Sequence, residues 1–217
     1  QLISPATADR IGGRCSIAAL QIVAPAKINL YLHVVGRRAD GYHLLDSLIA
    51  FAAAGDLVTV APADGLRLTI DGPFAPALPD DGDNLVLRAA RLLQAHGGEM
   101  KGAAITLTKN LPVAAGLGGG SADAAAALRA LNDLWRLELA DRTLSELGLV
   151  LGADVPVCLF GRSARIGGVG EEIHAARPLP ATGLVLINPG VAVSTTEIFN
   201  NLSRGHSTQG PQPVTDW

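Results

Sequence analysis

The sequence is poor in cysteine, in aromatic residues and in excess charge of either sign. Its 217 residues include two cysteines, 4% aromatic residues and a formal net charge of −3. Cys15 and Cys158 lie far apart, which excludes a disulfide framework and a cysteine-rich zinc site and fits a reducing compartment. With 17 basic and 20 acidic residues, the chain lacks the basic excess that nucleic acids and anionic membranes attract.

Long apolar runs are missing as well. No stretch of 18 apolar residues occurs, and the first 20 residues lack the basic and then apolar pattern of a secretory signal. We therefore expect a cytoplasmic protein with no membrane or nucleic-acid partner, and the oligomeric state stays unknown. The content of 48% apolar and 17% charged residues excludes intrinsic disorder and is sufficient for a hydrophobic core.

Hydrophobic periodicity predicts mostly strands first, and strands mixed with helices afterwards. Strands are predicted within 22–35, where Pro25 marks an edge or a bulge, and then over 48–51, 57–61, 66–70, 103–108, 157–160 and 184–187. Helices are predicted over 84–93, 121–135 and 141–150, with a further start at the capping box of 194–197. This order favours an α+β fold over a doubly wound parallel sheet.

The strongest local feature is a glycine-rich loop that runs into a predicted helix. The segment from Pro112 to Asp123 reads PVAAGLGGGSAD. Glycine amides and a helix N-terminus together favour the binding of an anion, and phosphate is the simplest candidate. The Ser121 hydroxyl is available to contact a phosphate or Mg²⁺. The alternative is an ordinary turn with Ser121 as the N-cap, and Asp123 could cap the helix or approach the metal. The pattern is neither a Walker A loop nor a Rossmann fingerprint.

Two charged residues lie in apolar segments that are far apart in the sequence. Alternation puts Lys27, Asn29 and Tyr31 on one face of a strand, which is either solvent-exposed or lines a polar cleft. Asp154 lies between a predicted helix and a predicted strand, where a carboxylate often bonds the turn backbone. Taken together, the two residues indicate a Lys–Asp pair for phosphoryl transfer to a hydroxyl group.

Four motifs in order resemble the GHMP small-molecule kinases: APAKINLYLHV, RADGYH, PVAAGLGGGSAD and LGADVP. They are most similar to the branch whose alcohol substrate carries a cytidine diphosphate. The resemblance covers about residues 22–199 and implies a two-domain α+β fold, with an N-terminal domain like ribosomal protein S5 domain 2 and a ferredoxin-like C-terminal domain that is only partly present. The implied division is an irregular lead-in (1–20), an ATP-binding catalytic domain (21–178) and the truncated start of a substrate domain (179–217). The third glycine-rich motif of the family is missing.

The resemblance also implies roles for individual residues in an ATP- and Mg²⁺-dependent kinase. Asp154 acts as the base, Lys27 steers the hydroxyl and the phosphate, and Asn29 holds the alcohol end of the substrate. Tyr42 and Phe199 stack on the two faces of cytosine while His43 bonds its edge, although Tyr42 and His43 also read as an ordinary turn pair. ATP is bound by Lys109, Pro112, Gly116, Leu117, Gly118, Gly119, Gly120, Ser121 and Ala122. Another GHMP kinase activity, or a nucleotide-binding fragment without turnover, remains the alternative.

Overall fold

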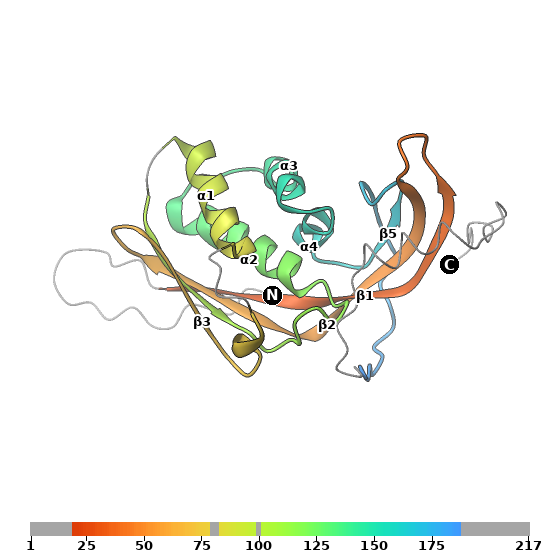
Figure 1. Cartoon of the computed structure of the whole chain (residues 1–217), viewed down its shortest axis with the longest axis horizontal. Coiled ribbons are helices and arrows are strands. Elements are labelled where there is room, and N and C mark those ends of the chain that lie inside the picture. The colour runs from red at the N-terminus through yellow and green to blue at the C-terminus, as the bar shows by residue number, and fades with distance from the viewer. Residues whose placement is uncertain (1–18, 79–82, 99–100, 188–217) are drawn as a thin grey trace.

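The computed structural model describes residues 19–78, 83–98 and 101–187. Within these ranges a six-stranded sheet carries four α-helices on one face (Figure 1). Strands dominate the first part of this region and helices the later part, so the predicted α+β class is confirmed. No helix in the described ranges is both long enough and apolar enough to cross a membrane.

Two long strands that pair antiparallel to each other form the main part of the sheet. β1 (Leu20–Arg37) and β2 (His43–Pro62) are joined by a turn that contains Asp40 and Gly41, and the ladder shifts register between Pro25 and Lys27, so Pro25 marks a bulge. The strands predicted over 48–51 and 57–61 are both part of β2. Gly55, which lies between these two predicted strands, is a point of close approach to β1, because a Cβ there would lie 2.5 Å from the Ala24 carbonyl oxygen.

The other edge of β2 pairs with two strands in succession. Its second half is antiparallel to β4 (Ala103–Thr108), which in turn is parallel to β3 (Leu66–Asp71). Its first half pairs with β5 (Ala164–Gly167), which is followed by β6 (Glu172–Ala175). A short 3₁₀ helix η1 (Ala75–Ala77) lies between β3 and the first α-helix.

The helices pack around α2 (Gly119–Trp135), which lies against β1 and β2. Its small alanines let the backbone come close to the sheet, and they are almost completely buried. α1 (Leu85–Gly97) begins at Asn84, whose side chain accepts from the N–H of Val86 at 2.8 Å. α3 (Asp141–Leu151) and α4 (Val155–Phe160) complete the layer.

Two predicted strands are wrong. Residues 157–160 belong to helix α4, because Pro156 suits the first turn of a helix and a run of four apolar residues does not distinguish helix from strand. Residues 184–187 form no strand, and the Ile187 side chain is 90% exposed, so this apolar run has no sheet to join among the described residues. The lead-in up to residue 18 and the capping box of 194–197 lie outside the described residues.

Candidate functional site

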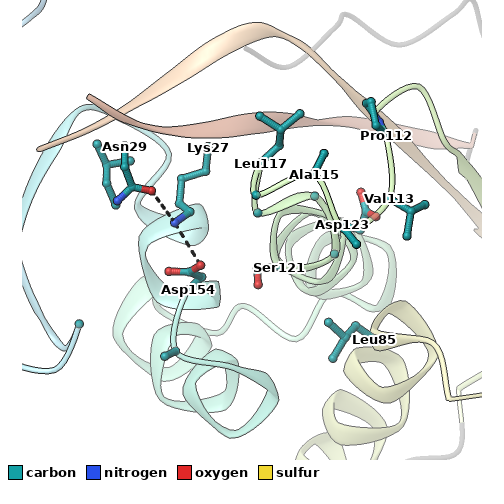
Figure 2. A pocket seen from close by; sticks show the side chains of 18 of the residues that line it. Lys27, Asn29, Leu85, Pro112, Val113, Ala115, Leu117, Ser121, Asp123 and Asp154 are labelled. Carbon is teal, nitrogen blue, oxygen red and sulfur yellow. Dashed lines mark hydrogen bonds and ion pairs between the residues drawn. The ribbon is translucent and has the colours of Figure 1, made fainter. Parts of the chain in front are cut away.

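A cavity of about 910 Å³ lies between the glycine-rich loop, the start of α4 and the concave side of β1 and β2 (Figure 2). Every residue from Pro112 to Ser121 lines it, as do Lys109 and Asp123. Ala122 does not line it, because its side chain is 2% exposed and packs into the core between α2 and the sheet. The sequence therefore located the glycine-rich part of the wall, but not most of the residues that β1, β2, α1 and β5 contribute to it.

The glycine-rich loop approaches β1 closely at Gly118. The N–H of Lys27 donates to the carbonyl of Leu117 at 2.9 Å, and Gly118 has a φ of +62°. A Cβ on Gly118 would lie 2.9 Å from Cε of Lys27, so a side chain here would displace the lysine. Gly118 is also the N-cap of α2, and no side chain caps the first turn, so the alternative role of Ser121 as N-cap is wrong.

Lys27 and Asp154 meet across this cavity. Nζ of Lys27 lies 3.1 Å from Oδ2 of Asp154 and donates to Oδ1 of Asn29 at 3.2 Å (Figure 2). The Lys27 side chain is 7% exposed and that of Asp154 is 50% exposed. The Asp154 carboxylate makes no capping bond at the start of α4, so it is directed to the lysine and the cavity.

A hydrogen-bond chain continues from Asn29 into β2. Nδ2 of Asn29 donates to Oγ of Ser47 at 2.8 Å, and this hydroxyl donates to the carbonyl of Tyr31 at 2.6 Å. Ser47 lines the cavity, and the sequence analysis missed it. No sequence pattern identifies Ser47, because residue 47 comes near Asn29 only through the register of β1 on β2, which includes a bulge between Asn29 and Tyr31.

The same bulge places Tyr31 on the other face of the sheet. Its hydroxyl donates to Oδ1 of Asp46 at 3.3 Å, and Arg165 binds both oxygens of that carboxylate. The prediction that Lys27, Asn29 and Tyr31 share one face is therefore wrong for Tyr31. Leu32 takes the cavity-facing position instead, since one extra residue in a strand reverses the alternation beyond it.

A second charged cluster lies beneath the loop. Nζ of Lys109 lies 2.5 Å from Oδ2 of Asp56 and 2.9 Å from Oδ2 of Asp123, and all three side chains are buried. Oδ1 of Asp56 accepts from the N–H groups of Asn110 and Leu111 at 2.6 and 2.8 Å. Asp123 is thus a partner of Lys109 and does not cap the helix, and the sequence analysis missed Asp56.

The burial of this cluster alters its proton affinities. Burial raises the pKa of Asp123 to about 7 and the neighbouring Asp56 adds to the effect, while Lys109 opposes it. Burial opposes the charge on Lys109, but the carboxylates of Asp123 and Asp56 outweigh it and raise the pKa of Lys109. Oδ1 of Asp123 has no hydrogen-bond partner among the described residues. The cluster therefore contains two carboxyl groups, each of which can carry a negative charge, and one ammonium group.

Tyr42 and His43, two of the residues expected at the cytosine, do not line this cavity. Tyr42 is 63% exposed at the β1–β2 turn, where the Arg38 guanidinium lies 5.7 Å from its ring centroid. His43 is half-buried at the start of β2. Leu32 and Leu45 extend the cavity along β1 and β2 in the direction of this turn. Phe199 lies outside the described residues.

No group of three histidine, cysteine, aspartate or glutamate side chains that could hold a metal ion occurs in the part of the chain described by the structure. Cys158 is a free thiol in α4. Burial and the nearby Asp154 raise the pKa of Cys158 to about 12, so it is not a reactive thiolate.

Known proteins that resemble this chain are kinases of the GHMP family. The family described as "GHMP kinases N terminal domain" matches residues 84–162. A 4-diphosphocytidyl-2-C-methyl-D-erythritol kinase from Ruegeria pomeroyi is 57% identical over 85% of this chain and 63% of its own length. Its counterpart from Paramagnetospirillum magneticum is 53% identical over 90% of this chain and 68% of its own length. A crystal structure of 4-(cytidine 5'-diphospho)-2C-methyl-D-erythritol kinase matches with a TM-score of 0.67 and 39% identity, over 83% of this chain and 63% of that one. The chain spans about two thirds of the length of these relatives.

Proposed function

Because this chain belongs to the family of 4-diphosphocytidyl-2-C-methyl-D-erythritol kinases within the GHMP kinases, we propose that it supplies the ATP-binding and catalytic part of that activity. The reaction transfers the γ-phosphoryl group of ATP to the 2-hydroxyl of the methylerythritol moiety, in the non-mevalonate route to isoprenoid precursors. We further propose that it occurs in the cytoplasm, where ATP is available. The observation that carries the proposal is the Lys27–Asp154 pair, which faces the glycine-rich loop across one cavity.

The glycine-rich loop is the proposed phosphate site. Gly118 allows the chain to turn directly into α2, whose first-turn N–H groups receive no side-chain cap. Such amides, together with the positive end of the helix dipole, stabilise the negative charge of a phosphate. The loop surface from Pro112 to Ser121 is therefore assigned to the nucleotide. Lys109 acts near the nucleotide from beneath this loop, where its buried ammonium contacts Asp56 and Asp123.

The donor set fits a magnesium ion carried by the nucleotide. Mg²⁺ keeps several waters and takes few protein ligands when phosphates supply the others, so a cage of carboxylates is not required. The Ser121 hydroxyl lines the cavity and would supply the protein contact. When bound, the ion would neutralise charge on the β- and γ-phosphates.

Asp154 and Lys27 perform complementary tasks on the acceptor hydroxyl. Half of the Asp154 side chain is exposed, so a hydroxyl in the cavity can donate to it and be oriented or deprotonated there. The buried ammonium of Lys27 stabilises negative charge that develops on the transferred group. Asn29 on β1 accepts a hydrogen bond from the lysine and is itself held by Ser47 on β2, which prearranges the charge before the substrate arrives.

The cytidine end of the substrate is assigned to the β1–β2 turn. Leu32 and Leu45 provide an apolar wall between Lys27 and this turn. The exposed ring of Tyr42 can stack on a base, His43 can bond its edge, and Phe199 is the proposed opposite face. This arrangement suits an elongated substrate with the reacting alcohol at one end and the base at the other.

The deciding experiment measures ADP release by the purified full-length protein with Mg²⁺ and ATP. We expect release to depend on 4-diphosphocytidyl-2-C-methyl-D-erythritol and to stay at background with mevalonate or homoserine as the acceptor. Mass spectrometry of the product should show one added phosphate on the alcohol. Equal rates with and without the cytidine substrate, or a preference for another acceptor, would contradict the proposal.

A further inference from the structure

Three buried charges connect the two ends of the glycine-rich loop. The loop leaves β4 at Lys109 and enters α2 at Gly119. At its start, the carboxylate of Asp56 accepts from the next two backbone N–H groups, at 2.6 and 2.8 Å. At its end, Asp123 lies in the first part of α2. The Lys109 ammonium contacts both carboxylates, so one cation links β2, the loop entrance and the helix.

The backbone of the loop rests directly on this cluster. A Cβ on Gly119 would lie 3.4 Å from Nζ of Lys109 and 3.6 Å from Oδ2 of Asp56. The backbone of Lys109 is itself held, because its N–H donates to the backbone carbonyl of Asp71 at 2.8 Å and its carbonyl accepts from the N–H of Phe74 at 3.1 Å. The ammonium therefore projects from a fixed point to a fixed pair of acceptors, and the helix start lies on top of it.

We propose that Asp56, Lys109 and Asp123 are positioning residues that set the affinity of the glycine-rich loop for a nucleoside triphosphate and take no part in phosphoryl transfer. The inference rests on the proposed function, since the nucleotide is the ligand of the loop. Backbone amides bind phosphate well only when they already point to one place, and glycines leave such a loop with the most conformational freedom to lose. A rigid support beneath the loop lowers that entropic cost of binding.

Charged groups suit this support better than apolar ones. A buried ion pair contributes little net stability, because desolvation offsets the attraction, but it tolerates few geometries. The separate carboxylate oxygens of Asp56 illustrate this, since one contacts Lys109 and the other contacts two amides. Loss of one link is therefore expected to cost nucleotide affinity more than fold stability.

The test uses Asp56→Asn and Asp123→Asn in the full-length protein, with Asp133→Asn on the exposed side of α2 as the matched control. Each amide variant at the cluster leaves Lys109 paired with one carboxylate, so no lone buried charge remains. Calorimetry gives the Kd for a non-hydrolysable ATP analogue with Mg²⁺, and steady-state kinetics give kcat. We expect Kd to rise at least fivefold in both cluster variants, kcat at saturating ATP to stay within twofold, and the control to match the wild type in both.

The outcomes separate this inference from the proposed function. Wild-type Kd in folded cluster variants overturns the inference alone, as does a tenfold or larger fall in kcat at saturating ATP, which would assign the cluster to the reacting atoms. A wild-type protein that binds no nucleotide overturns both. A protein that binds nucleotide without turnover contradicts only the proposed function, because calorimetry needs no reaction. If a single variant fails to fold, the combination Asp56→Asn, Lys109→Met and Asp123→Asn removes all three charges and is measured in the same way.

Discussion

Lys27 and Asp154 form an ion pair whose two members have very different access to solvent. The ammonium and carboxylate are 3.1 Å apart, yet the lysine side chain is 7% exposed and the aspartate side chain is 50% exposed. Asn29 holds the lysine on its buried side. The pair therefore consists of a fixed cation and an accessible carboxylate, which is the arrangement needed to receive a hydroxyl from the cavity.

Asp154→Asn is expected to lower kcat at least 100-fold while the Kd for ATP stays within about threefold. An amide cannot take the proton, and general-base contributions are typically 10² to 10⁴. Rates come from an ADP-release assay and affinities from calorimetry. The control is Asp141→Asn, which removes an exposed carboxylate at the start of α3. A kcat near the wild-type value in Asp154→Asn would remove this residue from the chemistry.

Gly118→Ala tests the close approach of the loop to Lys27, and Gly116→Ala is its matched control. Both glycines have positive φ, +62° and +74°, so both alanines carry a similar backbone strain of about 1–2 kcal/mol. Only at Gly118 would the new Cβ meet Cε of Lys27 at 2.9 Å, since Gly116 has nothing within 4 Å. We expect kcat/KM to fall at least tenfold further in Gly118→Ala. Equal losses in the two variants would show that the contact with Lys27 does not matter.

The raised pKa of Asp123 predicts a pH-dependent stability. Its pKa rises from 3.8 to about 7 on folding, so between these values the folded chain binds more protons than the unfolded chain. The contribution of Asp123 to the free energy of unfolding is therefore complete below pH 4 and is lost as the pH rises to about 7. Urea denaturation at pH 5 and pH 7.5 should show a larger decrease for the wild type than for Asp123→Asn. Parallel decreases would mean that Asp123 stays ionised throughout.

Tyr42→Ala is expected to raise KM for the cytidine substrate about fivefold or more, because a stacking contact contributes about 1 kcal/mol beyond its buried area. The Kd for ATP should not change, since Tyr42 does not line the cavity beside the glycine-rich loop. Tyr31→Phe is the control, because the Tyr31 hydroxyl bonds Asp46 on the opposite face of the sheet. An unchanged KM in Tyr42→Ala would exclude this ring from base recognition.

Local chemistry was sufficient to predict much of the fold. The apolar spacing of 84–93 and of 141–150 predicted α1 and α3, and Asp40-Gly41 forms the turn between β1 and β2. Each of these depends on groups a few residues apart, so the sequence contains the whole cause. The helix at 155–160 was missed because a short apolar run fits either a strand or a buried helix, and packing beside α2 decides between them.

The candidate site also combines features that local sequence determines with features that depend on the tertiary structure. The sequence by itself determined the glycine-rich loop, because four glycines before an alanine-rich helix specify amides and a helix N-terminus in any fold. The sequence also indicated the pair of Lys27 and Asp154, which the structure confirms. Only the tertiary structure decided that Ser47 supports Asn29 and that Asp56 joins Lys109 and Asp123. Those partners come from different strands and helices. A single bulge in β1 changes which side chains face the cavity, and strand register is set by the packing of the whole sheet.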